Sequence, residues 1–132
     1  MRTPWDVLAA VAAGGALGAA ARYGVDSAWP VPAGGFPWPT LAVNLAGCAV
    51  LGAVLELLAR LSAPHRLARP FLGTGLLGGF TTFSAYALET RTLLASGRPG
   101  LAAGYLAGTL FGALAALWLG MLGVRLAARR RG

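Results

Sequence analysis

Four long apolar segments constrain the fold of this chain more than any other feature. They cover residues 5–25, 38–61, 71–94 and 101–126. Each is close to or above the ~20 residues that an α-helix needs to cross a bilayer. Polar or Pro/Gly-rich stretches at 29–39, 62–70 and 96–100 separate them. We therefore predict an all-α membrane protein with four transmembrane helices in one domain, residues 1–132.

The composition agrees with this class. Only 11% of the residues are charged and 57% are hydrophobic, whereas a soluble domain carries about 25% charged residues. All eleven basic residues are arginine, and most lie at segment ends or in loops. That distribution is typical of membrane topology signals and does not favour a nucleic-acid partner.

The arginines also predict an orientation. Four spans place both termini and the 62–70 loop on one side of the membrane. That side carries eight arginines: Arg2, Arg60, Arg66, Arg69, Arg125, Arg129, Arg130 and Arg131. The other side carries three, namely Arg22, Arg91 and Arg98. The positive-inside rule then favours cytoplasmic termini.

The third segment contains glycines and hydroxyls where a plain lipid-facing helix would have none. Residues 73–84 read Gly-Thr-Gly-Leu-Leu-Gly-Gly-Phe-Thr-Thr-Phe-Ser. Irregular backbone inside a membrane is tolerated where protein buries it or where it lines a cavity. We predict a break near the midplane at Gly78 and Gly79, where freed carbonyls could bind a hard cation such as Na⁺. Thr81, Thr82 and Ser84 either bond back to carbonyls one turn earlier or line an ion pathway.

Other polar and aromatic residues inside the segments have two readings each. Asn44 is either an interhelical hydrogen-bonding group or a donor to a permeating anion. Phe83 and Tyr86, three residues apart, share a helix face. They either pack or turn electropositive ring edges toward a pore. Tyr105 and Thr109, four residues apart, form a short polar track on the fourth segment.

Two further features concern the segment ends and helix contacts. Arg22 is either an interfacial anchor or a group that draws anions to an entrance. Gly104, Gly108 and Gly112 repeat every four residues, a pattern that predicts a close helix–helix contact.

The titratable groups limit the possible mechanisms. The four carboxylates, Asp6, Asp26, Glu56 and Glu89, all lie toward segment ends. Proton-coupled transport usually needs a titratable group deep in the membrane, so a passive pathway is favoured. The sequence contains no catalytic or nucleotide-binding set of residues, so we do not expect an enzyme. A proton-coupled small-molecule exporter and a structural membrane subunit without transport remain as alternatives.

Three motifs resemble the Fluc/CrcB fluoride channels. They are residues 14–23 (GGALGAAARY), residues 40–47 (TLAVNLAG) and residues 78–84 (GGFTTFS) followed by Glu89. The resemblance covers nearly the whole chain in matching order. It implies a fluoride-selective channel in the plasma membrane that lowers cytoplasmic fluoride by passive export. It also implies a dual-topology dimer of antiparallel subunits, with two fluoride pathways along the interface and a structural Na⁺ at the centre.

The resemblance also implies roles for individual residues. The carbonyls of Gly78 and Thr81 in each subunit would hold the Na⁺. The ion pathway would involve Asn44, Phe83, Tyr86, Tyr105 and Thr109, with Thr40, Ser84 and Glu89 on its side and Arg22 in a vestibule. Two positions depart from the family pattern: Tyr86 stands where phenylalanine is usual, and Ala113 where serine is frequent. The arginine asymmetry leaves two partners open, a second copy of the chain or an oppositely oriented homologue.

Overall fold

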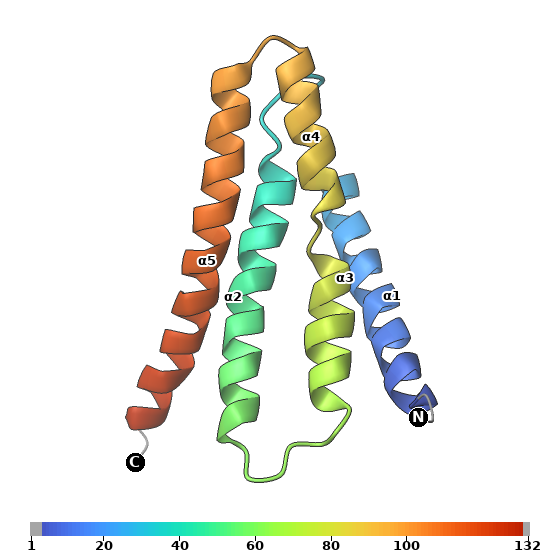
Figure 1. The fold of residues 1–132 in the computed structure, drawn as a ribbon, viewed down its shortest axis with the longest axis vertical. Coiled ribbons are helices and arrows are strands. Elements are labelled where there is room, and N and C mark those ends of the chain that lie inside the picture. Colours follow the sequence, from blue (N-terminus) through green and yellow to red (C-terminus); the bar gives the residue numbers. More distant parts are fainter. Residues whose placement is uncertain (1–3, 131–132) are drawn as a thin grey trace.

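The computed structural model describes residues 4–130, and every regular element in that range is helical (Figure 1). Arg2 and Arg131, two of the eight arginines counted on one side, lie outside these described residues. The elements in chain order are α1 (Trp5–Ala28), α2 (Trp38–Arg60), the π-helix η1 (Arg69–Leu77), α3 (Gly78–Phe80), α4 (Ser84–Ala95) and α5 (Pro99–Arg129).

Three of these helices, α1, α2 and α5, are long and apolar enough to cross a membrane. They correspond to the first, second and fourth predicted segments. The third predicted segment is divided among η1, α3 and α4, with 9, 3 and 12 residues. Helical structure stops at Phe80 and resumes at Ser84, so no single helix here reaches the ~20 residues of a span. The break was predicted at Gly78 and Gly79, which was wrong: both glycines are helical in α3, and the non-helical residues are 81–83, where the Thr82 backbone bonds to the Asn44 side chain.

Proline and glycine set the helix ends more closely than hydropathy does. Pro39 and Pro99 lie in the first turns of α2 and α5, where a missing N–H removes no helical hydrogen bond. Gly97 ends α4 with a φ of 70°. Its N–H donates to the Leu94 carbonyl, and the next N–H donates to the Leu93 carbonyl, both at 3.0 Å. This is the Schellman arrangement that satisfies terminal carbonyls.

The helices lie in a row, in the order α5, α2, η1 with α3, and α1 (Figure 1). The start of α1, the end of α5 and the loop of residues 61–68 all lie at the same end of the helices, at the bottom of Figure 1. At the opposite end, α4 packs against α5. The non-helical residues 81–83 therefore lie between the two ends of the helices, with α2 beside them.

Glycines allow the closest helix contacts. A methyl group on Gly18 of α1 would overlap the Leu76 carbonyl of η1, and one on Gly79 would overlap the Gly15 carbonyl. Between α2 and α5, a methyl group on Gly52 would overlap the Leu117 carbonyl. These backbones can approach only because the residues have no side chain.

The predicted stripe on α5 makes no close contact within the chain. Gly104 and Gly108 are exposed and have open space where a side chain would be. Gly112 meets only the side chain of Leu45. The contact between α5 and α2 uses Gly120 instead, whose Cβ position overlaps the Ala49 carbonyl. Gly104 and Gly108 of the stripe are therefore free on the outer face of α5.

Candidate functional site

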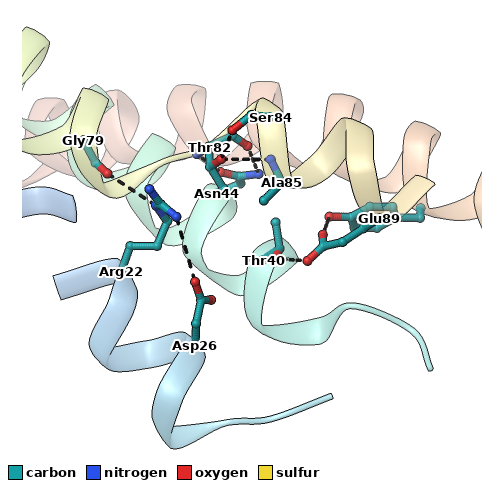
Figure 2. A network of polar contacts seen from close by, with 10 residues as sticks. Arg22, Asp26, Thr40, Asn44, Gly79, Thr82, Ser84, Ala85 and Glu89 are labelled. Atoms are coloured by element: carbon teal, nitrogen blue, oxygen red, sulfur yellow. Dashed lines mark hydrogen bonds and ion pairs between the residues drawn. The ribbon is translucent and has the colours of Figure 1, made fainter. Parts of the chain in front are cut away.

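Asn44 pairs with the interrupted backbone that follows α3. Its side-chain Nδ2 donates to the Thr82 carbonyl at 3.0 Å, and its Oδ1 accepts from the Thr82 N–H at 2.8 Å (Figure 2). The carboxamide thus replaces the helical partners that Thr82 lacks. Asn44 is only 7% exposed. Because Nδ2 carries two hydrogens, this pairing leaves one N–H available.

The three hydroxyls near the interruption have different partners. Thr81 Oγ1 donates back to the Leu77 carbonyl at 2.9 Å, the first of the two readings above. Thr82 Oγ1 accepts from the Ala85 N–H at 3.2 Å and lies 3.3 Å from Ser84 Oγ. Thr82 therefore caps the start of α4, where a free N–H needs an acceptor.

Several carbonyls at the interruption are left free. Among residues 4–130, no donor bonds to the carbonyl oxygens of Gly78 or Thr81. Gly79 differs, because its carbonyl accepts from Arg22 Nε at 3.5 Å (Figure 2). Arg22 also lies 3.9 Å from the Asp26 carboxylate. A cation at the C-terminal end of a helix segment interacts favourably with the helix dipole. Arg22 therefore stabilises the end of α3, where helical structure stops.

Thr40, Glu89 and Tyr105 form a second polar cluster. Thr40 Oγ1 donates to Glu89 Oε1 at 2.7 Å, and Tyr105 Oη donates to Glu89 Oε2 at 2.6 Å. Tyr105 is fully buried and Thr40 is 5% exposed. Both carboxylate oxygens thus have a hydroxyl donor, which fixes the glutamate side chain between α2 and α5.

The aromatic residues Phe83, Tyr86 and Tyr105 form a continuous set of ring contacts. The rings of Phe83 and Tyr86 have centroids 5.7 Å apart, and those of Tyr86 and Tyr105 are 5.3 Å apart in a T-shaped contact. Tyr86 Oη donates to the Leu106 carbonyl at 2.9 Å. This bond satisfies the additional hydroxyl and ties the ring to α5. Phe83 is 79% exposed.

A cavity of about 320 Å³ brings several predicted residues together. Its walls include Asn44, Thr81, Thr82, Phe83, Tyr86 and Thr109, and none of the described residues that line it is charged. Thr109 is 6% exposed, and its Oγ1 has no hydrogen-bond partner among the described residues. An unpartnered buried hydroxyl is uncommon and calls for an unseen partner.

The predicted pathway residues do not all meet at this cavity. Thr40, Glu89 and Tyr105 form their own cluster, Arg22 lies beside Gly79, and Ser84 contacts Thr82. Sequence reasoning also missed Cys48, which lines the cavity. The available signal was its spacing, because residues four apart share a helix face and Cys48 follows Asn44 by four.

The fold and the site define a small helical membrane protein with an interrupted helix beside an uncharged cavity. A family model described as "CrcB-like protein, Camphor Resistance (CrcB)" matches residues 9–121. The chain belongs to this CrcB family, as its motifs predicted.

Curated relatives cover most of the chain. A protein of Streptomyces coelicolor named "Fluoride-specific ion channel FluC 1" is 54% identical over 118 residues, which is 89% of this chain and 77% of the relative. "Fluoride-specific ion channel FluC 2" of Nocardia farcinica is 53% identical over 86% of this chain and 81% of its own length. "Fluoride-specific ion channel FluC" of Paracoccus denitrificans is 50% identical, with coverages of 84% and 88%. These names are those of channels, which confirms the prediction that the chain is not an enzyme.

Proposed function

We propose that this chain forms a fluoride-selective channel in the plasma membrane that lowers cytoplasmic fluoride by passive export. The unpartnered, buried hydroxyl of Thr109 in an uncharged cavity carries this proposal. The second N–H of Asn44 adds a donor to the same cavity. The relatives' names supply the identity of the ion.

The chemistry of the cavity suits a small anion. Hydroxyl and amide donors replace part of the hydration shell, and electropositive ring edges add attraction. A fixed positive charge would hold the ion too tightly for rapid release, because conduction requires that the ion also leave. In the described part of the chain, the arginines lie outside this cavity.

A dimer of antiparallel subunits is the assembly we propose. The support is an uncovered apolar surface: Phe83 is 79% exposed and Phe111 68% exposed, and Gly104 and Gly108 are open to close approach. The partner is a second copy or, given the arginine asymmetry, an oppositely oriented homologue. Crosslinking of the purified chain separates these, because a purely monomeric product without fluoride flux would indicate a missing homologue.

We also propose a structural Na⁺ at the dimer centre. The carbonyls of Gly78 and Thr81 fit this ion, because they lack hydrogen-bond donors and Na⁺ prefers oxygen ligands. Two carbonyls from each subunit would supply the protein ligands. The ion would neutralise carbonyl dipoles that the interrupted helix leaves without partners, and so would stabilise residues 81–83.

Fluoride efflux from liposomes, followed with a fluoride electrode, tests the function. The wild type should release fluoride and retain chloride, and Phe83→Ile should abolish most of the flux. Phe71→Ile, the same change on η1 outside the cavity and away from the proposed dimer surface, is the control and should conduct. Chloride efflux as fast as fluoride efflux would contradict the selectivity, and normal flux in Phe83→Ile would contradict the aromatic role.

The same preparation distinguishes the two alternatives. Transport that depends on a pH gradient and is lost in Glu89→Gln would indicate a proton-coupled exporter. Absence of any ion flux, with stable co-purification of other subunits, would indicate a structural membrane subunit.

A further inference from the structure

A second cavity, of about 340 Å³, lies at the end of the molecule where α2 ends and η1 begins. Its walls come from the last turns of α2, the following loop and the start of η1. The apolar wall includes Leu55, Leu58 and Pro64, and the polar wall consists of His65, Arg66 and Arg69. Small-molecule sites range upward from about 300 Å³, so the cavity is large enough for a headgroup.

The polar wall offers hydrogen-bond donors. Arg69 has no hydrogen bond or ion pair with any residue in the range 4–130. Arg66 pairs with Asp6 but keeps a largely exposed side chain. His65 Nδ1 accepts from the Leu67 N–H at 3.2 Å, so a neutral imidazole carries its proton on Nε2 and presents a donor there.

Carboxylates do not cancel this charge. Glu56, one residue from Leu55, gives one oxygen to Arg60 and the other to Arg125, both at 3.0 Å. It is 9% exposed and is satisfied away from the cavity. Among the carboxylates of residues 4–130, only that of Asp6 pairs with a cavity residue, so two guanidinium groups face one carboxylate. Guanidinium groups bind phosphate through paired hydrogen bonds. The excess of positive charge in the cavity therefore favours a phosphate-containing ligand.

The location of the cavity at the end of the membrane helices favours a lipid as the ligand. The loop joins two apolar segments, so it lies at the level of the lipid headgroups. Basic pockets at the ends of membrane helices are suited to anionic headgroups. The apolar wall beside the arginines matches the glycerol and the first acyl carbons that follow a lipid phosphate. We infer that this cavity binds the phosphodiester of an anionic phospholipid, with Arg66 and Arg69 on the phosphate and Leu55 and Leu58 on the apolar part.

Native mass spectrometry of the purified full chain in nonionic detergent tests this site. The probes are phosphatidylglycerol, phosphatidylcholine and inorganic phosphate, titrated separately. Phosphatidylglycerol should bind at least about tenfold more tightly than phosphatidylcholine, because only the former is a net anion. Inorganic phosphate at equal concentration should neither bind measurably nor displace the lipid, because it lacks the apolar contacts.

Two double variants provide the matched comparison. Arg66→Gln/Arg69→Gln should weaken phosphatidylglycerol binding about 30-fold, at the usual contribution of a basic side chain near a membrane surface. Arg129→Gln/Arg130→Gln removes the same charge from the same end of the molecule, outside the cavity, and should change binding by less than about twofold. Equal losses in the two pairs would show unspecific charge attraction and overturn the site. Unchanged binding in the first pair would also overturn it.

A single variant tests the site with less risk of misfolding than the double variants. Arg69→Gln removes a side chain without described partners, so the fold should tolerate it, and binding should weaken about fivefold. Binding of inorganic phosphate as tight as that of the lipid would assign the cavity to free phosphate and refute the lipid site. Fluoride flux plays no part in these readouts, so they are independent of the proposed channel activity.

Discussion

Replacing Asn44 by leucine tests the pairing that supports the helix interruption. The substitution introduces an apolar side chain of similar size and removes both hydrogen bonds to Thr82, at 3.0 and 2.8 Å. A buried polar group that loses its partner costs about 1–3 kcal/mol. Thr82 is only half-buried, so water can reach part of the freed backbone. We therefore take the low end of this range, about 1 kcal/mol, for the Thr82 N–H and for the Thr82 carbonyl. We expect a loss of about 2 kcal/mol in the stability of residues 81–83.

Hydrogen exchange measures this loss locally. A difference of 2 kcal/mol corresponds to about 30-fold faster exchange of the Thr82 amide. Cys48→Ala is the control: Cys48 lines the same cavity one turn later and makes no polar contact among the described residues. Its effect on that amide should stay below about threefold, since the change removes only one sulfur. Wild-type protection in Asn44→Leu, or equal acceleration in both variants, would refute the reasoning.

Three further predictions address the cavity and the helix contacts. Thr109→Val removes the unpartnered hydroxyl. Thermal stability in detergent should stay within about 0.5 kcal/mol of wild type because no hydrogen bond is lost, and fluoride efflux should fall at least about tenfold. Unchanged efflux would contradict the role of Thr109 as a donor. Tyr86→Phe removes one hydrogen bond to α5 and should lower the free energy of unfolding by about 1 kcal/mol. The preference for fluoride over chloride should persist because the ring stays. Loss of that preference would show that the hydroxyl sets selectivity. Gly18→Ala should prevent folding because its added methyl group overlaps the backbone of η1. Gly104→Ala should fold, but crosslinking should show a weaker dimer. An intact dimer in Gly104→Ala would place the interface elsewhere.

The positions of the helices were largely predictable. Hydropathy identified the segments now seen as α1, α2 and α5, because a membrane span is a local property of about 20 residues. The glycines and hydroxyls at 78–84 marked the region of the interruption, but the break lies at residues 81–83 and not at Gly78 and Gly79, which are helical in α3. Helix ends were less accurate: α1 continues to Ala28 and α5 covers Pro99–Arg129, since an apolar stretch need not end where its helix does.

The partners within the site were only partly predictable. The carboxamide of Asn44 bonds to the Thr82 backbone, whereas its role as a donor to an anion stays a prediction. The Gly104 stripe looked like an internal contact, yet α5 meets α2 at Gly120 instead. Periodicity identifies a face of a helix and cannot say which neighbour covers it.

The sequence by itself determined the class of the protein, the approximate helices, the segment that is interrupted and the family. Each of these depends on local hydropathy, on Gly and Pro conformational limits, or on motif order. Only the tertiary structure decided which polar groups have partners. Asn44 and Thr82 are 38 residues apart, and Thr40 and Glu89 are 49 apart. Packing of separate helices brings such pairs together, and the same packing leaves the Thr109 hydroxyl without a partner in the cavity.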